Sequence, residues 1–575
     1  MTKGSRVDSV PDRPNEAKYR GVILGAALGD ALGWPHENRA RNASGAPRGA
    51  LVFQSWVKRS GGRFQPHEEM IPAGTYSDDT QLVIAVARSR LQQRRWWDYF
   101  SRVELPLWTI YEKGGGGATI RAAKSWLKGV APWRGPATDV EKYFNAGGNG
   151  AAMRIAPHVL VSVDQPFDVA AKSIVVDSVI THGHPQGIVG ALSYGYALWI
   201  ALRNNSTLEY GQLIRDVLGN RSYWSNFPDV SDVWPDWYQI ASEHDFESNW
   251  SLAVDAQTRQ LEIGLNGLDA GALSVEQETL EAIGCFDKKI LGAGTVAASA
   301  SIYLASRYAA GPMEGVATGA FSKGADTDTL ASMTGALAGA ISGLDWLGSL
   351  VRSVQDYEFL SNLSADLQRV LPEDRPFDPV DSRYIGEFYR YLDGNGAVPI
   401  PPGLPKKAHA ADMVRSKSDN LRARSWVLDG PGDQTLVIKK LDRPRTQNRQ
   451  REDQDAFEFD ESQQSQRTAE FAGVGLFAAN IERSTAFYRD LLRLPVVRET
   501  PKLIQLGTHL VLRQSDGRVV AGTGTIVYIQ VLDIRACVRE FDRWKLDVPE
   551  IEQNGSRLSF LCRDPDGRTV EVFQR

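Results

Sequence analysis

Two short acidic segments carry the side chains best suited to chemistry. The segment SDDT at 77–80 precedes an apolar stretch, and DTDT at 326–329 precedes a glycine-rich one. Each segment alone is typical of a helix N-terminus, where Ser, Thr and Asp accept backbone N–H groups and the helix dipole favours carboxylates. Helix capping is therefore the simpler interpretation of either segment by itself.

Together, the two segments hold more anionic oxygen than two helix caps require. Their aspartates, with the hydroxyls of Ser77 and Thr329, would repel one another if the fold brought them together without neutralising cations. Mg²⁺ and Mn²⁺ prefer carboxylate, hydroxyl and water oxygens. The sequence has no comparable group of His or Cys side chains that would favour zinc. We therefore expect a pair of Mg²⁺ or Mn²⁺ ions if the two segments meet.

Two glycine-rich segments and a histidine are suited to an anionic, nucleotide-like ligand. The glycine run at 114–117 could turn backbone N–H groups toward a pyrophosphate, although a flexible loop is the alternative. In GGNGAAMR at 147–154 the glycines permit close approach, while Arg154 could instead be structural. The histidine of THGHP could contact a ligand or satisfy a core hydrogen bond. The candidate ligand-binding residues are Gly114, Gly115, Gly116, Gly117, Gly148, Asn149, Gly150, Met153 and His182.

Helices must position these side chains. From about residue 19 to 393, alanine-rich and leucine-rich segments of helical length dominate. Glycines recur every four residues at 21–33 and again at 335–343, so each helix would present a stripe without side chains where another backbone can approach. Asp30 interrupts the first stripe, and neither run is long enough to cross a membrane. We expect two closely packed helices inside a helical bundle.

Length and composition limit the class of protein. A chain of 575 residues exceeds one hydrophobic core. Its 42% hydrophobic and 23% charged residues exclude collagen-like, wholly disordered and polytopic membrane proteins. A net charge of -5 gives no bulk positive field for nucleic acid. Three cysteines, and no apolar run of signal-peptide length near the N-terminus, predict a cytoplasmic protein with no membrane contact.

The chain is expected to divide into two domains and a linker. A helical domain is predicted for 15–400, a partly disordered linker for 401–470, and a small domain for 471–575. The linker is predicted from PIPPGLP at 399–405 and from the polar stretch at 443–470. The apolar island at 426–440 either forms a hairpin or packs on a neighbouring domain, and both interpretations stay open.

The small domain contains an internal repeat. GVGLFAANI at 473–481 aligns with IVYIQVLDI at 526–534, and each copy continues into an amphipathic helix and further strand-like runs. The pattern predicts an α+β domain of duplicated βαβββ units.

The motifs of the helical part occur in an order that resembles the ADP-ribosylglycohydrolases, including the dinitrogen reductase-activating glycohydrolases. The resemblance covers roughly residues 19–345. Its motifs are GAALGDALGWPHE at 25–37, YSDDT at 76–80, KGGGGATI at 113–120, GGNGAAMRIAP at 147–157, ITHGHP at 180–185 and GADTDTLASMTGALAGA at 324–340. It implies an all-α domain that hydrolyses the N- or O-glycosidic bond between ADP-ribose and a modified protein, nucleic acid or small molecule. A catalytically silent ADP-ribose-binding or scaffold protein is the alternative.

The resemblance also implies roles for single residues. Glu37 matches the glutamate of the flap over the family's active site, and Glu37 and Asp326 are the leading catalytic candidates. Ser77 stands where the family usually has threonine, and Ala325 where a second glycine is common. The implied ligands of two Mg²⁺ or Mn²⁺ ions are Ser77, Asp78, Asp79, Asp326, Asp328 and Thr329.

The small domain resembles the vicinal-oxygen-chelate superfamily of glyoxalase and bleomycin-resistance proteins. The resemblance rests on NIERSTAFYRDLLRLPVV and the closing RDPDGRTVEVFQR. The superfamily's metal-ligand positions fall on or near Gly473, Val511 and Ile526, and only Glu571 keeps a ligand. One oxygen ligand cannot hold a metal ion. We therefore expect this domain to bind, dock or dimerise rather than to catalyse.

Overall fold

The structure, a computed structural model, forms two compact units, Met1–Thr446 and Gln447–Arg575. Each unit is described by itself. The described residues are 14–37, 51–61, 65–92, 94–271, 275–369, 374, 376–394, 408–418, 421–442, 474–478, 480–492, 494, 496–500, 503–506, 510–514, 526–530, 534–543, 551–554, 557–564 and 569–574.

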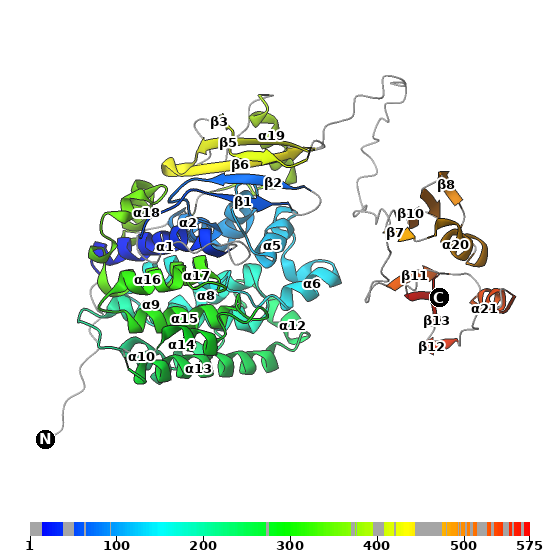
Figure 1. Ribbon diagram of the computed structural model, residues 1–575. Helices are drawn as coiled ribbons and strands as arrows, with labels where there is room; N and C mark the ends of the chain where they lie inside the picture. The colour runs from blue at the N-terminus through cyan, green and yellow to red at the C-terminus, as the bar shows by residue number, and fades with distance from the viewer. Residues whose placement is uncertain are drawn as a thin grey trace. The chain divides into compact units, whose positions relative to one another are not determined.

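Two helices with glycine stripes form the centre of the first unit. Helix α1 (Glu16–Glu37) lies against α17 (Thr327–Ser342), as Figure 1 shows. A Cβ atom added at Gly21 would lie 2.3 Å from the carbonyl oxygen of Gly343, and one at Gly33 would lie 2.2 Å from that of Thr327. No side chain fits at such distances, so the predicted close packing is confirmed. The stripe also sets the C-terminal end of α1 beside the N-terminus of α17.

The remaining helices pack around this pair and bury one continuous apolar core. None of the helices within the described ranges has the length and apolarity needed to cross a membrane. Their bounds are α2 (Asp78–Gln92), α3 (Trp96–Tyr99), α4 (Leu105–Trp108), α5 (Gly117–Leu127), α6 (Ala137–Phe144), α7 (Ala156–Ser162), α8 (Phe167–Thr181), α9 (Pro185–Arg203), α10 (Gln212–Gly219), α11 (Ser222–Ser225), α12 (Trp237–Ser242), α13 (Phe246–Asp269), α14 (Glu276–Ile283), α15 (Gly294–Arg307), α16 (Pro312–Ala320), α18 (Tyr357–Gln368) and α19 (Ser382–Leu392).

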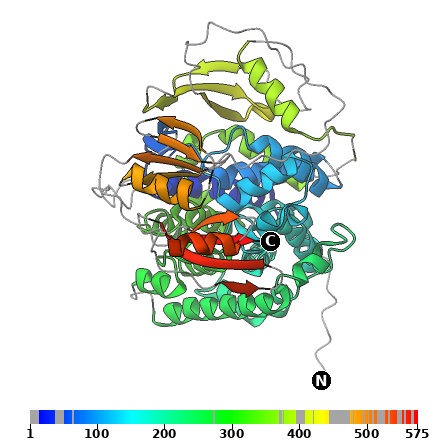
Figure 2. The same cartoon turned by 90° about the vertical axis from the view of Figure 1, so that its right-hand side faces the viewer.

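Two small sheets complete the helical fold of the first unit. One has the order β1-β2-β4 and the other β3-β5-β6, and both views place the second sheet beside α19 at one end of the unit (Figures 1 and 2). The strands are β1 (Trp56–Ser60), β2 (His67–Ile71), β3 (Ala408–Ala411), β4 (Val414–Ser416), β5 (Arg422–Asp429) and β6 (Thr435–Asp442).

Strands β3 to β6 show that part of the predicted linker is folded. They occupy 408–442 of the interval 401–470, and Trp426, Leu428, Leu436 and Ile438 join the apolar core of the helices. The apolar island at 426–440 therefore both forms a hairpin and packs on the helical unit. Alternating apolar residues in β5 and β6 form the buried face of this sheet. The proline-rich and polar sequences on either side give no sign of it. The rest of the expected linker, 443–470, lies outside the described residues.

The second unit confirms the duplicated βαβββ pattern. In each copy the first strand pairs in parallel with the last, giving the orders β7-β10-β9-β8 and β11-β14-β13-β12. The elements are β7 (Val474–Ala478), α20 (Ile481–Thr485), β8 (Val496–Thr500), β9 (Leu503–Leu506), β10 (Leu510–Gln514), β11 (Ile526–Gln530), α21 (Ile534–Arg543), β12 (Glu552–Asn554), β13 (Arg557–Arg563) and β14 (Thr569–Gln574).

Candidate active site

A cavity of about 270 Å³ in the first unit gathers most of the predicted site residues. It lies where the C-terminal end of α1 and the N-termini of α2, α5 and α17 meet. Thr119 and Gly292 also line it, although the sequence did not single them out. The predicted residues around it are Glu37, Asp78, Asp79, Gly114, Gly116, Gly117, Gly148, Asn149, Gly150, Met153, His182, Asp326, Asp328 and Thr329.

Asp30 of α1 holds the first acidic segment in place. Its carboxylate accepts hydrogen bonds from the backbone N–H groups of Ser77 (2.9 Å) and Thr80 (3.0 Å) and from the Thr80 hydroxyl (2.6 Å). These bonds satisfy backbone N–H groups at the start of α2. The Asp78 and Asp79 carboxylates would otherwise compete to accept hydrogen bonds from the same N–H groups. The sequence marked Asp30 only as a break in a glycine stripe, and a charge inside an apolar helix was the available signal.

Ser77 lies behind the cavity rather than on its wall. The residue is fully buried, and its Oγ accepts a hydrogen bond from the Asp79 backbone N–H (3.2 Å). Its hydroxyl therefore caps α2, as the simpler interpretation of this segment expected.

The two acidic segments touch each other. The Thr329 hydroxyl donates a hydrogen bond to Asp79 Oδ2 (3.2 Å), although the two residues are 250 positions apart. Asp326, at the start of α17, makes no side-chain capping bond and instead accepts one from Asn149 Nδ2 (2.8 Å). The fold thus meets the condition on which the cation site was predicted.

The carboxylates of the cavity are electrostatically unfavourable as they stand. Burial and the negative charges around them raise the pKa of the Asp78, Asp79 and Asp328 carboxyls well above the usual value. Asp79 Oδ1 is buried and has no hydrogen-bond partner among the described residues. Buried carboxylate oxygens normally accept hydrogen bonds or bind a cation, so this atom fits a hard cation.

Glu37 lies at the mouth of the same cavity. The residue is exposed by surface area, but protein atoms crowd its carboxylate, and this desolvation together with the charge of Asp326 raises the pKa of Glu37 to about 7. A carboxyl with this pKa is present in both protonation states near neutral pH.

Within the described residues, no three His, Cys, Asp or Glu side chains converge closely enough to form a complete metal site by themselves. The acidic side chains are instead spread around the cavity wall. Bound cations would therefore need hydroxyl and water oxygens to complete their coordination, as Mg²⁺ commonly does.

The glycine run differs from its predicted role at two positions. The N–H groups of Gly114 (3.2 Å) and Gly115 (3.1 Å) donate to Glu112 Oε2, so they do not point at a ligand. Gly115 does not line the cavity, and a Cβ atom there would lie 2.4 Å from the Trp108 ring. The acceptor Glu112 precedes the run by two residues and satisfies the turn locally. Gly116 and Gly117, at the start of α5, retain the arrangement suited to an anion.

A buried hydrogen-bond chain fixes His182. Arg154 Nη2 donates to Thr181 Oγ1 (2.8 Å), which lies 2.7 Å from His182 Nδ1. Because this hydroxyl accepts from Arg154, its own proton is available for Nδ1, and the neutral imidazole carries its proton on Nε2. Burial, with the Arg154 charge, lowers the pKa of His182 to about 3. His182 thus offers the cavity a neutral N–H donor.

Arg154 itself is structural, which was one of its two interpretations. Its side chain is fully buried and bonds the Asp177 carboxylate through Nε (2.8 Å) and the carbonyl oxygen of Gly150 through Nη1. It therefore connects the glycine segment at 147–154 to α8.

The positions compared with a metal site in the second unit are dispersed over three strands. Val511 lies on β10, Ile526 on β11 and Glu571 on β14, whereas Gly473 lies outside the described residues. That this unit binds or docks rather than catalyses stays a prediction.

A model of the ADP-ribosylglycohydrolase family matches residues 11–376. The ADP-ribosylhydrolase ARH3 of Homo sapiens is 26% identical over 374 residues, covering 62% of this chain and 93% of its own length. The ADP-ribosyl-[dinitrogen reductase] glycohydrolase of Rhodospirillum rubrum is 29% identical over 182 residues, covering 30% of this chain and 54% of its own.

Two kinds of solved structure are similar to parts of the chain. One, titled an ADP-ribosylglycohydrolase-related protein complex, is 21% identical, covers 62% of this chain and 98% of its own, and has a TM-score of 0.39. A lactoylglutathione lyase from Agrobacterium tumefaciens is 22% identical, covers 19% of this chain and 95% of its own, and has a TM-score of 0.17.

Proposed function

This chain belongs to the ADP-ribosylglycohydrolase family, and we propose that it is a metal-dependent hydrolase that releases ADP-ribose from a modified target by cleaving an N- or O-glycosidic bond. The observation that carries the metal dependence is Asp79 Oδ1, which is buried in a cavity lined by carboxylates from two helix N-termini and has no hydrogen-bond partner in the described ranges. A cation there would remove the mutual repulsion of these groups.

The residues that would hold two Mg²⁺ or Mn²⁺ ions are Asp78, Asp79, Asp326, Asp328 and Thr329, with Ser77 supporting them from behind. When bound, such ions polarise substrate oxygens and lower the pKa of water. Asn149 orients Asp326 by donating to one of its oxygens, which directs the other toward the remaining ligands.

Glu37 is the proposed proton carrier. Its pKa of about 7 lets it accept a proton from the attacking water or supply one to the leaving group. Its position at the cavity mouth, beside the charge of Asp326, places this exchange at the edge of the acidic cluster.

The other walls of the cavity suit an anionic part of the ligand. The N-terminus of α5 at Gly116 and Gly117 favours a negative charge, and His182 Nε2 supplies a neutral donor. Met153 adds a buried apolar contact on the same wall. These features support an ADP-ribose pyrophosphate as the bound group.

The second unit is proposed to recognise the modified target or to mediate dimerisation. Its duplicated βαβββ sheets support a role in binding rather than in chemistry, because only Glu571 keeps a ligand among the four compared positions.

The test measures ADP-ribose released by the full chain from a panel of defined adducts on arginine, serine, a nucleobase and an acyl group. Release is expected from at least one adduct, to stop with EDTA, and to return with Mg²⁺ or Mn²⁺. Equal release with and without EDTA would refute the metal dependence. Binding of ADP-ribose without release from any adduct would favour the silent ADP-ribose-binding protein.

A further inference from the structure

Three polar atoms converge beside Gly114 on the cavity wall. A Cβ atom at this residue would lie 3.3 Å from Trp34 Nε1, 3.3 Å from Asp78 Oδ1 and 3.4 Å from Lys58 Nζ, closer than a side chain is comfortably accommodated. Gly114 also has a φ of 101°, a conformation that other residues rarely adopt. Two donors and an acceptor thus meet beside a residue that has no side chain of its own.

The indole of Trp34 faces this space with an unused donor. Trp34 is fully buried near the end of α1, and its Nε1–H has no hydrogen-bond acceptor in the described part of the chain. The Trp56 ring of the β1–β2 hairpin packs edge-on against it, with ring centroids 5.3 Å apart. Buried polar groups nearly always have a hydrogen-bond partner. We therefore expect this N–H to donate to an oxygen of a bound ligand.

Lys58 brings a positive charge to the same space. It lies on β1, and its Nζ is 5.1 Å from the centroid of the Trp34 ring. Its neighbour across the ladder is Glu69, but Glu69 is already taken by Lys439 Nζ (2.9 Å) and His67 Nε2 (3.2 Å). Among the described residues the Lys58 ammonium forms no ion pair, and its charge acts on Glu69 as well as on Glu37 and Asp78 of the cavity.

The position of Lys58 depends on chain outside the segment that matches the family. Lys439 belongs to β6, and β2 is paired on its other edge with β4, whereas the family model ends at residue 376. Strands β4 and β6 thus brace the hairpin that carries Lys58.

We propose that Trp34 Nε1 and Lys58 Nζ form a binding site for one substrate oxygen that carries or develops negative charge. The proposal rests on the proposed function and adds two residues that contact the substrate. The positive charge of the ammonium offsets the negative charges of Asp78 and Glu37, so that an electron-rich oxygen can approach. Such an oxygen comes either from the pyrophosphate of ADP-ribose or from the atom that joins ADP-ribose to an O-linked target. A guanidinium leaving group offers no such oxygen and is repelled by Lys58.

The experiment compares Lys58→Met and Trp34→Phe with Arg59→Met, a matched control on the same strand whose side chain is 79% exposed. One arm measures the Kd of ADP-ribose by calorimetry. The other measures kcat/KM for an ADP-ribosylserine peptide and for ADP-ribosylarginine. Melting temperatures confirm that the variants fold, and Lys58→Arg, which keeps the charge, is expected to retain most function.

A loss of roughly tenfold or more is expected from each test variant, the size typical of a charge-assisted hydrogen bond. Weaker ADP-ribose binding would assign the oxygen to the pyrophosphate. Unchanged binding with lower kcat/KM for the serine adduct alone would assign it to the linking oxygen. Lys439→Met, which frees Glu69 to draw Lys58 away, is expected to give a smaller loss of the same kind.

The proposal is overturned if neither arm changes, or if Arg59→Met matches the test variants. Failure of the proposed function looks different, because the wild-type chain would then release no ADP-ribose from any adduct of the panel. Without release no linking oxygen develops charge, so the site would then require the pyrophosphate, and variants that bind ADP-ribose as the wild type does would overturn it.

Discussion

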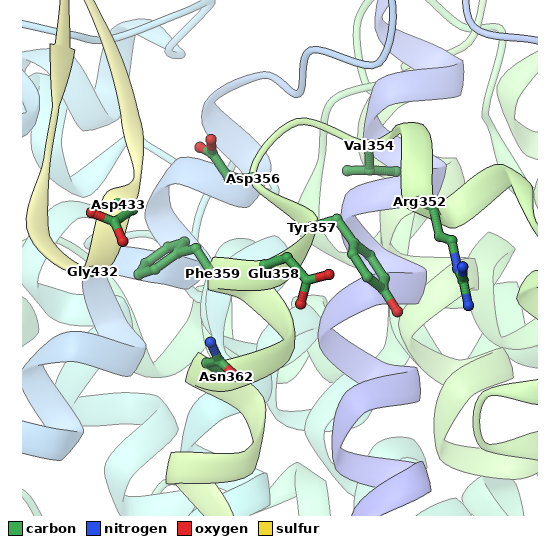
Figure 3. Close-up of a pocket in the computed structure, with 9 residues that line it drawn as sticks. All are labelled: Arg352, Val354, Asp356, Tyr357, Glu358, Phe359, Asn362, Gly432 and Asp433. Carbon is green, nitrogen blue, oxygen red and sulfur yellow. The ribbon is translucent and has the colours of Figure 1, made fainter.

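Two cavities formed by described residues of the first unit are bordered by aspartates, and they differ in the hydrogen bonds that those aspartates accept. The larger, about 540 Å³, lies where the β5–β6 turn at Gly432 and Asp433 meets Phe359 of α18 (Figure 3). There the Asp356 carboxylate accepts hydrogen bonds from the Tyr76 hydroxyl (2.8 Å), the Thr435 N–H (3.0 Å) and Gln355 Nε2 (3.1 Å). In the smaller, about 270 Å³, Asp79 Oδ1 has no hydrogen-bond partner within the part of the chain that the structure describes.

The difference shows that volume is a poor guide to chemistry in this molecule. The three bonds all end on Asp356 Oδ2 and tie this side chain into the fold. Asp79 Oδ1, by contrast, is buried without a partner among the described residues and is available to a ligand. Asp356 ties β6 to Tyr76, which directly precedes the first acidic segment. The larger cavity is thus part of the scaffold that holds the smaller one.

Exchanging the two aspartates for asparagine gives the largest expected contrast. Asp79→Asn removes a proposed cation ligand and should lower ADP-ribose release at least ~10³-fold, while stability is kept or raised because buried repulsion is relieved. Asp356→Asn should cost about 1–3 kcal/mol of unfolding free energy, because it removes the charge from an oxygen that accepts three hydrogen bonds, with a smaller loss of activity. Release assays and urea denaturation check both. Similar losses of activity in the two variants would remove the distinction between the cavities.

The hydrogen-bond chain behind His182 predicts a smaller effect confined to binding. Thr181→Val keeps the shape but removes the hydroxyl that holds His182 Nδ1, so the proton can move to that nitrogen and the Nε2 donor is lost in part. The Kd of ADP-ribose should rise roughly tenfold with kcat little changed, and Thr181→Ser should restore binding. The ¹⁵N chemical shifts of the imidazole report the tautomer. An unchanged tautomer in Thr181→Val would disprove this role.

The pH dependence of stability should also distinguish the smaller cavity from the larger one. Carboxyls with a raised pKa bind more protons in the folded protein than in the unfolded one. Their contribution to stability is therefore fully present below the unfolded pKa of about 4 and is lost as the pH rises through the folded-state pKa. Glu37 titrates near 7, and the deeper carboxyls shift in the same direction. His158 and His182, whose pKa values are lowered to about 4 and about 3, oppose this trend until the pH is about one unit above their unfolded value of about 6.5, but the carboxyls with raised pKa outnumber them.

In EDTA, the melting temperature should therefore fall by a few degrees between pH 6.5 and 7.5. Added Mn²⁺ should raise it more at pH 7.5 than at pH 6.5, because the cation replaces protons on the carboxylates. Asp79→Asn should flatten both responses, whereas Asp356→Asn should leave them intact. A melting temperature that rises over this interval without metal would contradict the electrostatics of the cavity.

Local patterns in the sequence predicted much of the site, and long-range contacts explain what they missed. The spacing of Gly21 to Gly33 predicted the α1–α17 contact, and the acidic segments were recognised because their residue types exceed what caps need. The bonds of Asp30, and of Glu112 to the glycine run, depend on which neighbour the fold supplies. Strand β4 escaped prediction because its partner β2 lies far away in the chain, whereas β6 pairs with the neighbouring β5 in the hairpin that was one of the two interpretations of 426–440.

The smallest effect is expected from removing the second unit. Both cavities are built from residues before 434, and β6 ends at Asp442, whose carboxylate bonds Arg424 of β5 (2.6 Å). A chain that ends at Thr446 should therefore keep its melting temperature and its turnover of a small ADP-ribosyl substrate within about twofold. A chain that ends at residue 394 loses β3 to β6 and with them the partners of Asp356 and Glu69. Its melting temperature and its turnover should therefore both fall. Equal loss in the two truncations would show that the helical unit depends on the second unit, and the cavities could then not be treated as features of the first alone.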